Sequence, residues 1–233
     1  MNKPDEPSND FKALALIKFF SSKERLESFV AGTWYCNTPQ YYRGNTMPGV
    51  GDRTESCINY WDVELGHSLP KLTIDGQEKD LSEAKNILCY NSLESHDSWL
   101  QCFSLIGPYN GYEDTIDKVS KECGKDFILL PIKNLPELVS KVDIASKSNM
   151  HHGAVRYSDN PLEFGIFVKS LGYSYQKEYR FALEKCEKGH KSAREFEVGN
   201  IEHLVTINGT LKFEQPNGAI IYYSNGNTLK TLK

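Results

Sequence analysis

The chain has no long run of apolar residues, which limits the classes of protein it can belong to. In its 233 residues, no apolar stretch approaches the roughly 20 residues that a membrane-spanning helix needs. The first ten residues are polar and acidic, unlike the basic and apolar segments of a secretory signal peptide. We therefore expect a cytoplasmic protein with no membrane contact, in which residues 1–10 form a polar leader and residues 11–233 a single domain.

The chain also has no excess of positive charge. Lys and Arg number 27 against 31 Asp and Glu, so the formal net charge is −4 and the isoelectric point is about 5.9. Such a chain has no global field to bind phosphate backbones without sequence preference. A nucleic-acid partner would need a local basic patch.

The six cysteines form no Cys-x-x-Cys pair. A zinc framework and a dense disulfide scaffold are therefore not indicated, and we expect reduced, mostly structural thiols. His151 and His152 are adjacent and would point in opposite directions on a strand, with no third ligand at a typical spacing, so we expect no metal site. Cys102 has no identifiable histidine partner and is interpreted as a buried strand residue.

Aromatic and turn-forming residues are abundant. Thirteen Tyr and eleven Phe, together with frequent Gly, Asn and Ser, favour strands and turns over long helices. Strands are predicted at 14–20, 57–65, 71–74, 87–90, 99–105, 127–130, 154–157 and 175–183, and helices at 21–32, 113–123 and 135–142. The fold class is therefore α+β and strand-dominated, with short flanking helices.

Four local features refine this prediction. Ser21 and Glu24 have capping-box spacing, and Gly32 supplies a stop for the first helix. Strands 87–90 and 99–105 are expected to pair with each other, and Asp75-Gly76 is expected to form a tight turn. At the C-terminus, Asn208-Gly209 and Asn217-Gly218 predict a β-meander over residues 204–223.

Gln176 and Glu178 are the strongest candidates for chemistry. On the predicted strand 175–183 they would point the same way, while Tyr179 and Phe181 would face the core. A carboxylate beside an amide suits chemistry at a ribose, where the carboxylate stabilises an oxocarbenium-like transition state. On an open cleft face, replacing Glu178 by Gln would leave stability nearly unchanged. The alternative is a solvated strand face on which Glu178 or Arg180 forms a weak cross-strand ion pair.

A glycine-rich loop over residues 43–52 and the residues that flank it supply further candidates. Arg43 and Arg53 are candidates for clamping a pyrophosphate through the planar guanidinium fork. Tyr42 is a candidate for stacking on a nicotinamide or adenine ring. The alternatives are a solvated loop of mixed charge and ordinary aromatic packing.

Three segments resemble a bacterial and phage family catalogued only as a domain of unknown function. They are the aromatic first strand and following serines at 17–22 with Leu26 and Gly32, the Gln-Cys-Phe-Ser strand at 101–104, and the segment from Val168-Lys169 to the late strand at 175–181. Their order is similar to the ADP-ribosyltransferase fold. In that fold a first-strand Arg or His, a serine-bearing strand and a [Gln/Glu]-x-Glu strand meet around NAD in a split-sheet cleft.

The resemblance implies roles for individual residues. Ser104 would correspond to the second-motif serine, and Gln176 and Glu178 to the Gln-x-Glu pair. This sequence departs from the pattern at the first strand, where Lys18 and Phe19 stand nearest to the expected Arg or His. Lys18, Phe19, or a loop arginine would then contact NAD.

The resulting hypothesis is a mono-ADP-ribosyltransferase-like enzyme that uses NAD as its substrate. It would transfer ADP-ribose to a protein or nucleic-acid acceptor, as a toxin or phage-conflict effector with a cognate inhibitor protein, or hydrolyse NAD without an acceptor. The rival hypothesis is a non-catalytic binding or inhibitor protein that uses the same sheet for recognition. The enzyme requires Ser104 and Glu178 to converge on one cleft, whereas the binding protein does not.

Overall fold

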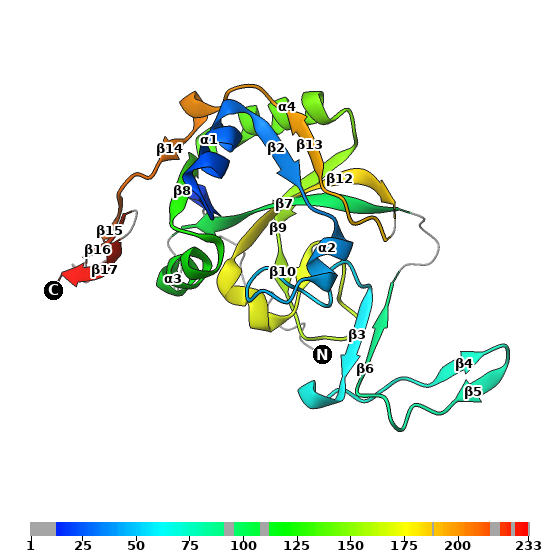
Figure 1. Ribbon diagram of the computed structural model, residues 1–233. Helices are drawn as coiled ribbons and strands as arrows, with labels where there is room; N and C mark the ends of the chain where they lie inside the picture. Colours follow the sequence, from blue (N-terminus) through cyan, green and yellow to red (C-terminus); the bar gives the residue numbers. More distant parts are fainter. Residues whose placement is uncertain are drawn as a thin grey trace, which may run out of the picture.

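A six-stranded sheet organises the chain (Figure 1). The computed structural model describes residues 13–90, 96–107, 112–187, 189–214, 220–224 and 227–232. The order of the strands is β14-β8-β1-β7-β12-β9, and every neighbouring pair is antiparallel. The strands are β1 (Ala15–Phe20), β7 (His96–Ile106), β8 (Asp126–Pro131), β9 (Met150–Ala154), β12 (Glu178–Glu187) and β14 (Thr206–Ile207). The predicted α+β, strand-rich class is confirmed.

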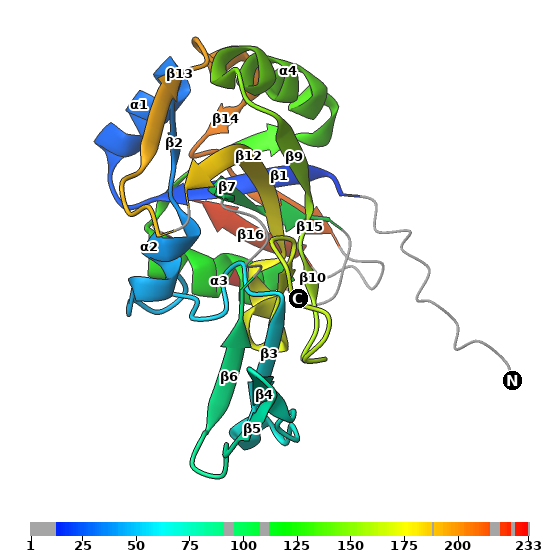
Figure 2. The same cartoon turned by 90° about the vertical axis from the view of Figure 1, so that its right-hand side faces the viewer.

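Both faces of this sheet are covered (Figure 2). One face packs against α1 (Lys23–Ala31), α4 (Leu135–Ser146), β2 (Thr33–Cys36) and its partner β13 (Arg194–Glu197), and the other against α3 (Tyr112–Cys123). Because side chains alternate along a strand, Phe103 and Phe181 enter the first core, while Ile17 packs with Ile116 of α3 in the second.

The first helix begins one residue later than predicted. The cap is Ser22, whose hydroxyl accepts a hydrogen bond from the Arg25 amide. The predicted stop at Gly32 is confirmed by its φ of 125°. A Cβ at that position would lie 2.6 Å from the carbonyl carbon of Gly199, so no side chain fits there.

Shorter helices join the remaining segments. They are α2 (Pro39–Gly44) and the 3₁₀ helices η1 (Val63–Leu65), η2 (Ile132–Asn134), η3 (Leu171–Gln176) and η4 (Glu202–Leu204). Pro39 opens α2, and the Thr38 side chain caps it by accepting from the Tyr41 amide at 3.0 Å. Among the described residues, no helix combines the length and the apolar character that crossing a membrane requires.

Two paired hairpin segments form an arm that projects from the body (Figures 1 and 2). The arm contains β3 (Asn59–Asp62) paired with β6 (Asn86–Cys89), and β4 (Leu72–Ile74) paired with β5 (Gln77–Lys79). The predicted turn is confirmed, since Asp75 and Gly76 both have positive φ values, 51° and 75°. The expected pairing of 87–90 with 99–105 is wrong. In the structure β6 pairs with β3 in the arm, and β7 pairs with β1 and β12 in the main sheet.

The C-terminal segments only partly follow the predicted meander. Strands β15 (Leu211–Glu214), β16 (Ile220–Ser224) and β17 (Asn227–Leu232) form a separate three-stranded sheet, but β14 joins β8 in the main sheet. Asn208 explains the difference, because its side-chain oxygen accepts from the Phe127 amide at 2.7 Å and fixes the turn against β8. Asn217-Gly218 lies outside the described residues.

Helix α4 offers a matched test of how much the core contributes to stability. Leu138 is 1% exposed in the first core, whereas Ile144 on the same helix is 73% exposed. We expect Leu138→Ala to lower the free energy of unfolding by about 2 to 5 kcal/mol through cavity formation. Ile144→Ala should change it by no more than about 0.5 kcal/mol. Urea denaturation measures both, and equal losses would contradict this arrangement of α4.

Candidate functional site

The sheet opens between β1 and β7. Their ladder runs from the pair Ala15–Ile106 to the pair Ile17–Ser104, after which β1 continues along β8 and β7 continues along β12. Lys18 lies at the point of divergence, where its Nζ donates to the Cys102 carbonyl at 2.9 Å. Lys18 thus provides a hydrogen-bond donor for the Cys102 carbonyl, which lies just beyond the end of the β1–β7 ladder.

A cleft of about 860 Å³ lies at this opening. Its volume falls within the usual range for small-molecule sites, roughly 300 to 1,000 Å³. Six of the residues predicted from sequence line it: Lys18, Phe19, Tyr42, Ser104, Gln176 and Glu178. Ser104 and Glu178 are direct partners in the β7–β12 ladder, so they converge on one cleft as the enzyme hypothesis requires.

The two loop arginines do not line this cleft. Arg43 donates to the Glu55 carbonyl at 2.8 Å and to Gln40 at 3.2 Å, and its guanidinium lies 4.8 Å from the Tyr90 ring centre. Arg53 is exposed to solvent. Arg43 lies in the last turn of α2 and contacts Tyr90 at the base of the arm, so the structure does not bring the predicted phosphate contacts to the other candidates.

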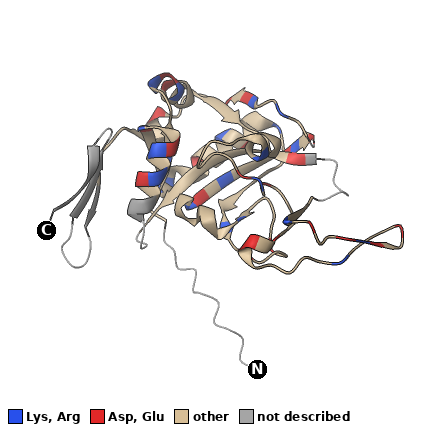
Figure 3. Ribbon diagram, turned by 60° about the horizontal axis from the view of Figure 1, so that its bottom comes forward, with Lys and Arg blue, Asp and Glu red and all other residues tan. Residues whose placement is uncertain are grey.

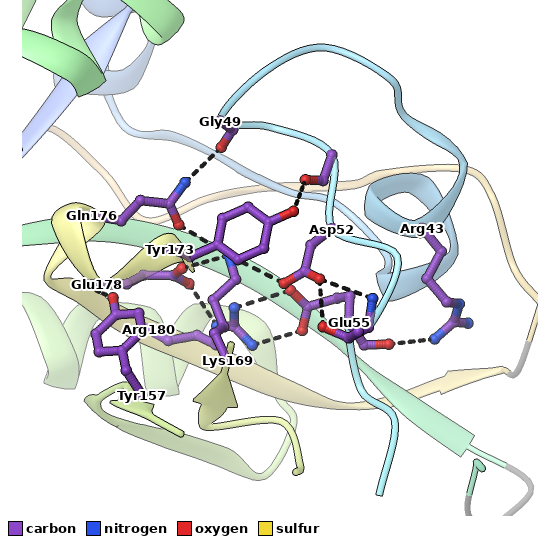
Figure 4. A network of polar contacts seen from close by, with 12 residues as sticks. Arg43, Gly49, Asp52, Glu55, Tyr157, Lys169, Tyr173, Gln176, Glu178 and Arg180 are labelled. Atoms are coloured by element: carbon purple, nitrogen blue, oxygen red, sulfur yellow. Dashed lines mark hydrogen bonds and ion pairs between the residues drawn. The ribbon is translucent and has the colours of Figure 1, made fainter. Parts of the chain in front are cut away.

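The expected alignment of Gln176 and Glu178 along one strand is wrong. Gln176 is the last residue of η3, Lys177 has a φ of 44°, and β12 begins only at Glu178. The left-handed residue breaks the strand, so period-two alternation does not relate the two side chains. They are nevertheless close, because Lys169 bridges them (Figure 4).

Lys169 lies on β11 (Val168–Lys169), which pairs in parallel with β10 (Arg156–Tyr157). Its Nζ is 3.1 Å from Gln176 Oε1 and 3.0 Å from Glu178 Oε2. The amide nitrogen of Gln176 donates in turn to the carbonyl of Gly49 at 2.7 Å. Glu178 and Gln176 are therefore held by a lysine that was not among the residues predicted for the site.

Arg180 connects Glu178 to a second carboxylate (Figure 4). Its Nε donates to Glu178 Oε1 at 2.7 Å, and its two terminal nitrogens reach both oxygens of Glu55 at 2.7 and 3.0 Å. Glu178 is 4% and Arg180 1% exposed, so the alternative of a solvated strand face is wrong. The predicted packing of Tyr179 and Phe181 in the core is confirmed.

Asp52 completes the polar cluster. One carboxylate oxygen accepts from the amide and the hydroxyl of Thr54, and the other lies 3.6 Å from Lys169 Nζ. The cluster holds three buried carboxylates and two buried cations, namely Asp52, Glu55, Glu178, Lys169 and Arg180. With every member ionised, the cluster carries one negative charge in excess.

These contacts determine the protonation of the central pair. Burial alone would raise the pKa of Glu178, but Arg180 and Lys169 hold it well below its usual range. Burial alone would lower the pKa of Lys169, but the surrounding carboxylates, Glu178 first among them, raise it above its usual value. Burial raises the pKa of Cys102, which keeps it a thiol and argues against a nucleophilic thiolate.

The sequence held only a partial signal for this cluster. Arg180 follows Glu178 at the i+2 spacing of a strand, which predicts a shared face. Lys169 lies in a two-residue strand, and no local pattern indicates that its side chain is buried. Asp52 and Glu55 lie in a loop whose polarity predicts solvent exposure, yet both are buried.

Comparisons with protein-family models, with curated proteins and with solved structures find no match for this chain. Functional conclusions about it therefore rest on its own residues.

The burial of Glu178 changes what its replacement should do. Removing one partner of a buried ion pair costs about 3 to 5 kcal/mol, because the other charges lose their compensation. The nearly unchanged stability expected for an open cleft face is therefore corrected, and Glu178→Gln should lower the free energy of unfolding.

Glu178 should also make stability depend on pH. Its pKa in the folded chain lies below that of an unfolded glutamate, about 4.3, so its stabilisation is complete above that pH and is lost as pH falls below it. In urea titrations between pH 7 and pH 3, we expect the advantage of the wild type over Glu178→Gln to shrink below about pH 4.3. Glu187→Gln, exposed on the same strand, is the control. Parallel pH curves for the wild type and Glu178→Gln would contradict an ion-paired Glu178.

Proposed function

We propose that this chain is a mono-ADP-ribosyltransferase-like enzyme that cleaves NAD at its nicotinamide glycosidic bond. The observation that carries the proposal is the adjacency of β1, β7 and β12, the three strands that hold the motif-like segments. Ser104 on the middle strand is the direct partner of Ile17 on one side and of Glu178 on the other. This arrangement supports a split-sheet cleft with one residue set from each strand.

The charge of the cleft suits the transition state of this reaction. As the glycosidic bond breaks, nicotinamide leaves with the electron pair and the ribose becomes cationic. The acceptor then bonds to the same ribose carbon and loses a proton. Glu178 is held ionised in a buried setting, where a fixed negative charge acts strongly on a developing cation.

The other lining residues divide between the two ends of the proposed substrate. Lys18 donates to two neutral oxygens, those of Gln101 and the Cys102 carbonyl, so its third N–H suits a phosphate oxygen. Tyr42 offers an aromatic ring to a base, whereas Phe19 is buried against Phe127 and helps form the wall. Ser104 borders the ribose-facing carboxylate.

The proposal predicts release of nicotinamide from NAD labelled in its adenylate part. We expect Glu178→Gln to lower the rate by about a hundredfold or more, with NAD affinity changed only a few fold, because the lost charge acts mainly in the transition state. Incubation with protein and nucleic-acid acceptors, followed by measurement of transferred label, identifies the acceptor class. Release without transfer indicates hydrolysis.

Because Glu178→Gln is expected to be less stable, circular dichroism should establish the folded fraction before rates are compared. Lys18→Met, outside the buried ion pairs, provides a second test and should weaken NAD binding without abolishing folding. Glu187→Gln should behave like the wild type in both measurements. Full NAD cleavage by Glu178→Gln would refute the transferase mechanism.

A binding protein is the second candidate, and the projecting arm favours it. Four aliphatic side chains on the arm are exposed: Val63, Leu65, Leu72 and Ile74. Residues 59–89 contain six acidic and three basic residues, a difference of three negative charges (Figure 3). Exposed aliphatics on an acidic arm suit contact with a protein more than contact with nucleic acid.

If the arm contacts a protein, the face that carries Leu72 and Ile74 should matter more than the opposite face. The double variant Leu72→Ser/Ile74→Ser is expected to lose co-purification of a cellular partner, while Thr73→Ser between them should retain it. Nicotinamide release without an acceptor should be the same in both. Equal co-purification by the wild type and the double variant would leave the exposed aliphatics without a binding role.

A further inference from the structure

We infer that Lys169 is a positioning residue that holds Gln176 and Glu178 in their working arrangement. This inference rests on the proposed function, since it concerns the same cleft. In a continuous strand, the backbone alone would align residues two apart. Here Lys177, with its φ of 44°, interrupts the strand, so the alignment needs another source.

The side chain of Lys169 provides that source. An ammonium group has three donors, and those of Lys169 face Gln176 Oε1 at 3.1 Å, Glu178 Oε2 at 3.0 Å and Asp52 Oδ2 at 3.6 Å. Its Nζ also lies 4.9 Å from the centre of the Tyr173 ring. The position of the ammonium is therefore defined from several sides.

The strands that carry Lys169 also hold the backbone of Glu178. Tyr157 pairs with Lys169 in the β10–β11 ladder, and the Tyr157 hydroxyl accepts from the Glu178 amide at 2.7 Å. The same two-stranded unit thus fixes both the main chain and the carboxylate of Glu178. A shift of β11 would move both contacts together.

Lys169 also decides how Gln176 presents its amide. Because an ammonium group only donates hydrogen bonds, the oxygen of Gln176 must face Lys169 and its nitrogen must face the Gly49 carbonyl. Gln176 also forms a side-chain hydrogen bond with Tyr175. The orientation of the Gln176 amide is thus set by Lys169 at its oxygen and by the Gly49 carbonyl at its nitrogen.

The second effect of Lys169 is electrostatic. Charged and titratable groups face Glu178 from six segments: Lys18 of β1, Tyr42 of α2, Asp52 and Glu55 of the loop before β3, Cys102 of β7, Tyr157 and Lys169 of the β10–β11 pair, and Arg180 of β12. Only Lys169 and Arg180 among these form ion pairs with the Glu178 carboxylate. Removing Lys169 halves that set, so Glu178 should protonate at higher pH.

The test compares Lys169→Met and Lys169→Arg with Lys133→Met, an exposed control on η2. For Lys169→Met we expect kcat for nicotinamide release to fall about tenfold or more, with KM for NAD changed only a few fold. The acidic limb of its pH profile should move to higher pH. Lys169→Arg keeps the charge, so its acidic limb should stay in place and its kcat should lie between those of the wild type and Lys169→Met.

A carbon-13 NMR titration of the Glu178 carboxyl group gives a readout that needs no activity. Its resonance is assigned by its loss in Glu178→Gln, and its pKa should rise in Lys169→Met and not in Lys133→Met. If the wild type cleaves no NAD, the proposed function fails, while this titration still tests the contact itself. Unchanged kcat, acidic limb and Glu178 pKa in folded Lys169→Met would overturn the inference. If that variant does not fold, a wild-type kcat in Lys169→Arg would overturn it.

Discussion

The buried ion pair between Glu178 and Arg180 is the contact on which the site depends. Arg180 reaches past Glu178 to both oxygens of Glu55, so one guanidinium joins β12 to the loop that leads into the arm. Burying a charge is unfavourable unless the charge is paired and hydrogen-bonded. In this cluster each charge offsets the desolvation cost of its oppositely charged partners. Removing any one of these charges would leave its partners buried without compensation.

This dependence relates the fold to the chemistry. Buried ion pairs are weak evidence for stability, since apolar residues of similar size often pack as well. In this chain the buried charged cluster lies beside the cleft, and Glu55, Glu178, Lys169 and Arg180 line it. The first core, with Trp34, Phe103 and Phe181, lies on the opposite face of β7 and β12 from Ser104 and Glu178.

Sequence patterns predicted where strands and core residues lie better than they predicted which strands pair with each other. Alternation placed Tyr179 and Phe181 in the core, because local periodicity depends only on neighbouring residues. The pairing of β6 with β3 depends on contacts between distant segments, which no local pattern encodes. The same limit applies to the site: Glu178 was singled out by a strand spacing from Gln176 that the structure does not have. Lys169 meets both residues only because β11 folds beside the start of β12.

The divergence of β1 from β7 affects which amino-acid substitutions this cleft can accept. Its opening is produced by the backbone, where one ladder ends at Ile17 and Ser104 while the ladders on either side continue. Side chains along the walls can therefore be exchanged without closing the gap, provided that Lys18 or another donor satisfies the Cys102 carbonyl. The backbone opening can therefore stay the same while substitutions in the wall change which ligands would fit. In this way one fold can carry different binding sites.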